Sequence, residues 1–106
     1  MQRRSISVVI PNFNGRHLLE ANLPSVYEAL NFVNIPYEII VVDDGSVDET
    51  SKAVAQMADS DERVRLITFE TNKGRGAARA AGVKAARGRR VAMVDADIVL
   101  PRDWWT

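Results

Sequence analysis

Four short apolar runs, each followed by a polar or glycine-containing turn, most strongly constrain how this chain folds. They cover residues 5–10, 37–42, 64–69 and 91–94, and the first two consist mainly of Val and Ile. Between them, apolar residues recur at the three- and four-residue spacing of amphipathic helices. Buried strands that alternate with helices predict a mainly parallel sheet with helices on both faces. The expected fold class is therefore α/β, in the element order β-α-β-α-β-α-β.

The intervening helices carry their own start and stop signals. The first contains Pro24, which lacks an N–H and is expected to kink or split the helix. Ser46 and Glu49 have the spacing of a capping box, so the second helix is expected to begin at Ser46. Gly88 is expected to end the third helix. A small-residue face that can lie close to a sheet is expected from Ala77, Ala78, Ala81 and Ala85.

Size and composition restrict the class of protein. The 106 residues suffice for one domain, and the absence of cysteine excludes a disulfide scaffold, a thiolate zinc site and a cysteine nucleophile. Fourteen basic and fourteen acidic residues cancel, so no nucleic-acid partner is expected. The charges are uneven, however, because the segment 73–90 has seven basic residues and no acidic one.

No apolar run approaches the roughly 20 residues needed to span a bilayer. The chain is therefore expected to be cytoplasmic. Any association with the cytoplasmic face of a membrane is expected to come from parts beyond this chain.

Polar residues follow every expected strand. In open parallel sheets, ligands bind beyond the carboxyl ends of the strands. The four turns are therefore expected to form a binding site at one edge. Their residues are Pro11, Asn12 and Asn14, then Asp43 and Asp44, then Asn72, Lys73 and Gly74, and finally Asp95 and Asp97.

Asp95 and Asp97 form a D-x-D pair at the end of the fourth run. Carboxylate oxygens suit Mg²⁺ or Mn²⁺, which typically take one or two carboxylates together with waters and substrate phosphates. A solvated turn is the simpler interpretation of an isolated D-x-D. The position after a buried strand in this topology favours the metal.

Asp44 and the basic segment complete the expected site. Asp44 can accept the N3–H of uracil or the N1–H of guanine, whereas cytosine offers no donor there. The alternative interpretation is a turn and helix cap around Ser46, which is compatible with binding. Arg75 and Arg79 share a helix face near its start, where free N–H groups favour phosphate. Lys84 and Arg87 are expected to face solvent.

Together these segments resemble the family 2 glycosyltransferases, which have the GT-A fold. The matching text is VVIPNFNG (8–15), EIIVVDDGSVDET (38–50), NKGRGAARAAG (72–82) and VDADIVLP (94–101). The resemblance covers essentially the whole chain. It implies that residues 1–106 form the Rossmann-like nucleotide-sugar-binding half of a GT-A domain, truncated at its C-terminal end before the catalytic base.

The resemblance implies an inverting glycosyltransferase that uses a nucleoside-diphosphate sugar, usually a UDP sugar, and a divalent cation, Mn²⁺ or Mg²⁺. The acceptor would be an unknown carbohydrate or lipid-linked acceptor. The catalytic base is expected beyond residue 106, so this chain alone is expected to be inactive.

The resemblance also assigns residues to the donor. It places Pro11 and Phe13 along the nucleotide, and the segment 72–79 along the base and diphosphate. The family often has Asn where this chain has Ala80. The expected donor-binding residues are Pro11, Asn12, Phe13, Asn14, Asp43, Asp44, Asn72, Lys73, Gly74, Arg79 and Asp95, and the expected metal ligands are Asp95 and Asp97.

Three other classes of protein share parts of this pattern. A non-catalytic nucleotide-sugar-binding module would contain the same residues. A sugar-phosphate nucleotidyltransferase would carry a Gly-rich loop with Arg and Lys after the first strand, and PNFNGR (11–16) has little of that. A phospho-acceptor signalling domain would place its acidic pair after the first strand, whereas here the pair follows the second.

Overall fold

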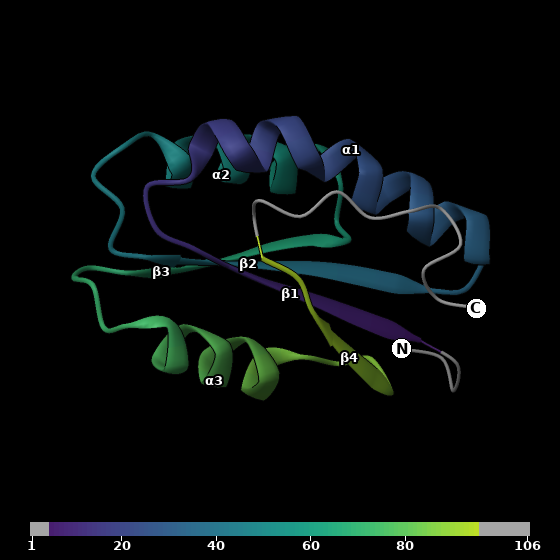
Figure 1. Ribbon diagram of the computed structural model, residues 1–106. Helices are drawn as coiled ribbons and strands as arrows, with labels where there is room; N and C mark the ends of the chain where they lie inside the picture. The colour runs from purple at the N-terminus through teal and green to yellow at the C-terminus, as the bar shows by residue number, and fades with distance from the viewer. Residues whose placement is uncertain (1–4, 96–106) are drawn as a thin grey trace.

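The sheet of this protein is parallel throughout its described part. The structure, a computed structural model, describes residues 5–95 (Figure 1). Strands β1 (Ile6–Asn12), β2 (Tyr37–Asp44), β3 (Val64–Phe69) and β4 (Arg90–Met93) lie side by side in the order β3-β2-β1-β4. Each neighbouring pair is parallel. The α/β fold class expected from the sequence is confirmed.

The direction in which strands are added reverses after β3. Helices α1 (Arg16–Val33) and α2 (Thr50–Ser60) lie on one face of the sheet, and α3 (Arg75–Ala85) lies on the other (Figure 1). Right-handed crossovers that run in opposite directions along a sheet put their helices on opposite faces. The reversal leaves a crevice between the carboxyl ends of β1 and β4, where open α/β sheets bind ligands.

The strands are buried to different degrees. All eight residues of β2 are buried, because β2 lies between two strands and beneath helices on both faces. Strand β4 is at the edge of the described sheet, and three of its four residues are exposed. The main core, between the sheet and α1 and α2, includes Ile6, Val8, Ile10, Leu23, Leu30, Ile39 and Val41.

Helix α3 lies close to the sheet because its inward residues are small. Ala78 and Gly82 are buried. A Cβ atom at Gly82 would lie 2.2 Å from Cγ1 of Val9, which is itself fully buried in β1. The small-residue face expected from the sequence is therefore the surface that contacts the sheet.

Two signals in the sequence do not divide or end a helix as expected. Of the two effects expected from Pro24, a kink or a split, the split does not occur, because α1 is one helix of 18 residues. The missing N–H removes one hydrogen bond, and the apolar residues that α1 buries on both sides of Pro24 hold the helix to the sheet. Helix α3 ends at Ala85 and not at Gly88. Gly88 instead permits a close approach, since a Cβ there would lie 2.6 Å from the backbone nitrogen of Ser7.

A buried hydrogen-bond network closes the amino edge of the sheet, opposite the crevice. The carboxylate of Glu38 accepts from Ser7 Oγ at 2.6 Å, Arg65 Nη1 at 2.8 Å and the Arg87 N–H at 2.6 Å. Ser7 Oγ in turn accepts from the Gly88 N–H at 2.7 Å. Burial by itself raises the pKa of Glu38, but the bonds from Ser7, Arg87 and Arg65 outweigh it and hold the pKa below its ordinary value. The ionised carboxylate ties the turn before β4 to β1 and β2.

The close approach of α3 to the sheet predicts opposite effects of alanine at its two glycines. Gly82→Ala forces a methyl group against Val9, so we expect a loss of about 1–3 kcal/mol in the free energy of unfolding. Gly76→Ala meets no atom within 4 Å, so we expect a gain of up to about 1 kcal/mol from helix propensity. Urea unfolding curves of both variants measure the difference. Equal stability of the two variants would contradict the close packing of α3.

Candidate functional site

A hollow of about 410 Å³ lies at the carboxyl edge of the sheet, where the strand order reverses. Residues from all four polar turns line it, so these turns do meet in space. The lining residues anticipated from the sequence are Pro11, Asn12, Phe13, Asp44, Asn72, Gly74 and Asp95. Three further lining residues, Gly15, Leu18 and Ala78, were not anticipated from the sequence. Arg75 also lines the hollow, and the sequence had placed it only at the start of a helix.

Other anticipated residues lie beside the hollow and not in its lining. They are Asn14, Asp43, Lys73 and Arg79. Asp97 lies outside the described residues. The structure therefore divides the anticipated set into residues that can touch a ligand in the hollow and residues that shape the surrounding loops.

Asp44 joins the end of β2 to the turn that begins α3. It is buried, and its carboxylate accepts from the Lys73 N–H at 2.7 Å, the Gly74 N–H at 3.0 Å and Asn72 Nδ2 at 3.2 Å. Among the described residues, the Lys73 N–H is the only donor to Oδ1, so this oxygen has room for one further donor from a ligand. The main role of Asp44 is thus to hold the turn at residues 72–74. Any contact of Asp44 with a ligand must use the remaining lone pair of Oδ1.

Gly45 makes this junction possible, and sequence reasoning assigned it no role. Its φ of +73° lies in the left-handed region, and a Cβ there would lie 2.4 Å from the backbone nitrogen of Asn72. A glycine directly after two aspartates at a strand end is a signal for a turn with positive φ. Only glycine allows the two loops to come this close.

Asn14 and Asp43 connect the loops after β1 and β2. Asn14 Oδ1 accepts from the Val47 N–H at 2.7 Å, and the Asn14 N–H donates to Ser46 Oγ at 2.9 Å. Asp43 accepts from the Ser46 N–H at 3.1 Å and from the Ser51 hydroxyl. Ser46 is therefore engaged between the loops, and the capping box expected to start a helix at Ser46 is wrong.

The N-cap residue of α2, Glu49, makes no side-chain capping bond. The first residue of the helix, Thr50, is instead held by the side chain of Asp48. Oδ1 of Asp48 accepts from the Thr50 N–H at 3.0 Å and from Thr50 Oγ1 at 2.5 Å. Burial alone raises the pKa of Asp48, but these bonds and one from the Arg16 N–H hold it below its ordinary value. Because the Thr50 proton goes to Asp48, Thr50 Oγ1 accepts from Asn12 Nδ2 at 3.2 Å. Asn12 Oδ1 has no hydrogen-bond partner among the described residues, although it is buried.

Charged side chains stand at the rim of the hollow. Arg79 Nη2 and Asp95 Oδ1 are 3.8 Å apart, and their side chains are 44% and 43% exposed. An exposed pair at this distance holds its geometry weakly, so both groups can turn toward a ligand. The hard oxygens of Asp95 suit Mg²⁺ or Mn²⁺. Within residues 5–95, no three acidic or histidine side chains are grouped closely enough to hold a metal ion by themselves.

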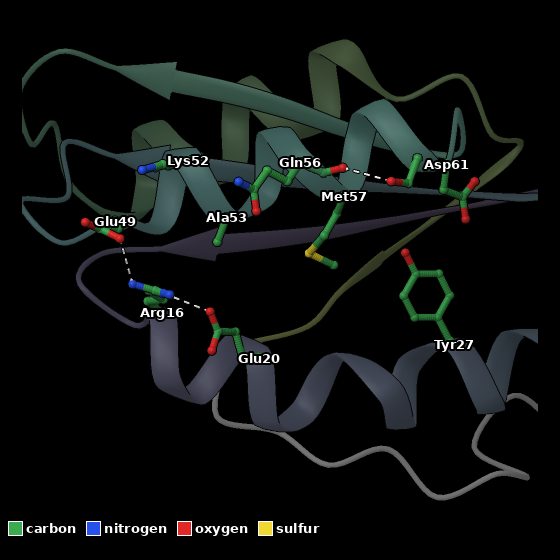
Figure 2. A pocket seen from close by; sticks show the side chains of 10 residues that line it. Arg16, Glu20, Tyr27, Glu49, Lys52, Ala53, Gln56, Met57 and Asp61 are labelled. Carbon is green, nitrogen blue, oxygen red and sulfur yellow. Dashed lines mark hydrogen bonds and ion pairs between the residues drawn. The ribbon is translucent and has the colours of Figure 1, made fainter.

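A second hollow, of about 680 Å³, lies between α1 and α2 (Figure 2). At one end Arg16 pairs with Glu20 at 2.8 Å and with Glu49 at 3.0 Å. Tyr27 and Met57 line it further along the helices. None of the site residues anticipated from the sequence lines it. Its carboxylates are paired, Glu20 and Glu49 with Arg16, and Asp61 with Arg63. The carboxyl-edge hollow is therefore the candidate functional site.

The part of the chain from residue 5 to residue 95 includes no helix with the length and apolar character required to cross a membrane.

Comparison with known proteins gives one consistent family. The model of the glycosyl transferase family 2 matches residues 7–106. The chain is 39% identical over 105 residues to the dolichyl-phosphate beta-glucosyltransferase of Mus musculus, a match that covers 89% of this chain and 31% of the mouse protein. The chain thus spans about three tenths of the length of that relative.

Solved structures with bound donors share the fold. The structure of S. aureus TarS 1-349 in complex with UDP-GlcNAc matches 93% of this chain and 28% of its own, with a TM-score of 0.79 and 28% identity. The mannosyltransferase PcManGT from Pyrobaculum calidifontis, in complex with GDP-Man and Mn²⁺, matches 97% of this chain and 30% of its own, with a TM-score of 0.81 and 29% identity. Both neighbours have a nucleotide sugar bound.

The anchoring role of Asp44 predicts a stability difference between two aspartates of the site. Asp44→Asn places an amide group against backbone N–H donors, so we expect a loss of about 1–3 kcal/mol in the free energy of unfolding. Asp95→Asn changes only an exposed pair, so we expect a change within about 0.5 kcal/mol. Urea unfolding of both variants without ligand is the measurement. An Asp44→Asn variant as stable as the parent chain would show that Asp44 does not anchor the turn.

Proposed function

Because the chain belongs to glycosyl transferase family 2, we propose that its carboxyl-edge hollow binds the nucleotide part of a nucleoside-diphosphate sugar, specifically a UDP sugar. The observation that carries this proposal is the convergence of the four strand-end loops on one hollow at the reversal of the strand order. The proposed reaction of the whole protein is transfer of the sugar to an acceptor with inversion at the anomeric carbon.

The base fits the side of the hollow formed by the loops after β1 and β2. Phe13 lines the hollow and is 52% exposed, so its ring offers a face on which a base can stack. Asp44 Oδ1 retains one lone pair, which can accept the N3–H of uracil. The same oxygen would accept the N1–H of guanine, and the PcManGT neighbour has GDP-Man bound. Cytosine and adenine present no equivalent donor.

The diphosphate fits the start of α3. Arg75 lines the hollow at the first residue of this helix. The first N–H groups of a helix have no acceptor within it, and together with the helix dipole they attract phosphate. Arg79, one turn later, is exposed and can turn from Asp95 toward the diphosphate. This arrangement would hold the donor with its phosphates toward β4.

Asp95 and Asp97 are the residues that would hold a divalent cation. When bound, Mn²⁺ or Mg²⁺ neutralises the charge that develops on the departing diphosphate. Asp95 stands at the rim beside Arg79, so its carboxylate can take part in that site. We place the general base that accepts the proton of the acceptor hydroxyl beyond residue 106, because the family resemblance puts it downstream of the D-x-D pair.

A lipid-linked acceptor is the acceptor class that we propose. The mouse relative is named for transfer to dolichyl phosphate. This assignment depends on the family relationship.

The proposed base site predicts a selective effect of Phe13. We expect UDP to bind more tightly than CDP or ADP, and Phe13→Ala to weaken UDP binding at least about fivefold through lost stacking. Phe32→Ala is the matched control, since Phe32 is also 52% exposed but lies on α1 outside the hollow. Calorimetric titration with the three diphosphates is the measurement. Equal affinities for the three, or an equal loss in both variants, would remove the base site from the hollow.

The proposed metal site predicts that nucleotide binding depends on Mn²⁺ or Mg²⁺. We expect Asp97→Asn to abolish this dependence, because it removes a carboxylate charge from the D-x-D pair. Asp59→Asn, on the exposed surface of α2, serves as the control and should leave the dependence intact. The measurement is UDP affinity in excess Mn²⁺ and in excess chelator. Equally tight binding by the parent chain in both conditions would show that the D-x-D pair is a structural turn.

A further inference from the structure

The two helical layers of this protein carry opposite charge. On one side of the sheet, α3 and the loops that flank it, residues 73–89, have six basic residues and no acidic one. On the other side, the segments 16–33 and 48–63 that contain α1 and α2 have three basic residues, Arg16, Lys52 and Arg63, and seven acidic residues, Glu20, Glu28, Asp48, Glu49, Asp59, Asp61 and Glu62. The net charge of zero therefore hides a strong separation across the sheet, whose two faces are visible in Figure 1.

The basic residues occupy the outward side of α3. Ala78 and Gly82 face the sheet and are buried, whereas Arg79, Val83 and Lys84 are exposed. Val83 is 48% exposed, so this surface offers an apolar side chain among cations. Arg87, in the turn after the helix, is exposed as well. We refer to Arg79, Val83, Lys84 and Arg87 as the α3 surface.

The charge of the α3 surface is not neutralised within the described part of the chain. Arg79 has one weak pair, with Asp95 at 3.8 Å, and no described carboxylate lies within 4.0 Å of the side-chain nitrogens of Lys84 or Arg87. Glu38, which lies near Arg87, is buried and bonded to Arg65, Ser7 and the Arg87 backbone. A partner with negative charge would therefore meet cations that have no competing carboxylate.

We propose that the α3 surface docks on an anionic lipid bilayer. Basic side chains interspersed with an exposed apolar residue suit the headgroup region, where each cation near the surface adds to the attraction. The choice of a lipid partner rests on the proposed lipid-linked acceptor. From the sequence, we expected membrane association to come from parts beyond this chain. The separation of charge across the sheet now indicates that α3 contributes to membrane association as well.

A nucleic acid fits this surface less well. The segment 73–90 has no aromatic residue on which bases could stack. The acidic layer behind the sheet would repel a long polyanion that wraps around the protein, whereas a flat bilayer meets only the basic side.

Docking through α3 would also place the proposed donor site beside the membrane surface. The helix begins at the hollow, where Gly74 and Arg75 are lining residues, and it runs away from it along the sheet. A bilayer that lies along α3 therefore passes beside the hollow. The acidic α1 and α2 layer then faces away from the anionic lipid. A lipid-linked acceptor would reach the donor without leaving the membrane surface.

The test is cosedimentation of the 106-residue chain with phosphatidylglycerol–phosphatidylcholine vesicles and with phosphatidylcholine vesicles, without any nucleotide. We expect binding only to the vesicles with phosphatidylglycerol, and loss of that binding in high salt. Lys84→Glu should weaken it about tenfold or more, because a cation is replaced by an anion at the surface. Lys52→Glu is the matched control, since it makes the same change on an exposed position of α2 and should leave binding unchanged.

Three results would overturn the proposal, provided that circular dichroism shows both variants folded. They are no preference of the parent chain for phosphatidylglycerol, an equal loss for Lys52→Glu and Lys84→Glu, and capture of single-stranded RNA in place of vesicles. Vesicle binding is measured without a donor, so its failure leaves UDP binding untouched. Failure of UDP binding with intact, Lys84-dependent vesicle binding would instead reject the donor site alone.

Discussion

The carboxylate of Asp44 holds the turn that begins α3, and the shape of the candidate site depends on this contact. Three donors from residues 72–74 converge on it, and Gly45 allows the approach because no Cβ would fit against Asn72. The start of α3 is therefore positioned from β2, three elements earlier in the chain. The same contact positions the N–H groups with which, as we propose, this helix start binds phosphate. Asp44, for which we propose a contact with the base, thus also fixes the turn that we propose to lie beside the diphosphate.

The loops after β1 and β2 are held in a similar way. Their polar side chains form hydrogen bonds within and between the loops in the absence of a ligand. Asn14 and Asp43 both engage the 46–48 turn, and Asp48 orients Thr50 and, through it, Asn12. Preorganised loops lose less conformational entropy when a ligand binds, so the free-energy cost of ordering them is smaller. The exposed members of the site, Phe13, Arg79 and Asp95, remain the groups that can still move toward a donor.

The α/β class and the four strands could be predicted from the residues alone. Strands β1 and β2 are β-branched apolar runs, β3 alternates, β4 overlaps the short apolar run 91–94, and turn residues follow each of them. The start of α2 could not. Ser46 and Glu49 satisfy the local capping pattern, but a cap also depends on which partners the rest of the fold presents. Asn14 and Asp43 engage Ser46, and the helix starts four residues later, at Thr50, which bonds to Asp48. The end of α3 was missed for a similar reason, since Gly88 serves a contact with Ser7 that is distant in sequence.

The sequence by itself determined the periodicities, the order of the elements and the polar turn after each strand, because these follow from neighbouring residues. Only the tertiary structure decided which of those turns share one hollow, since strand order is a property of long-range pairing. It also separated Phe13 and Asn72, which line the hollow, from Asn14 and Asp43, which support it. The opposite charge of the two helical layers likewise emerged only when the crossover of α3 placed a basic segment on the face opposite the acidic helices.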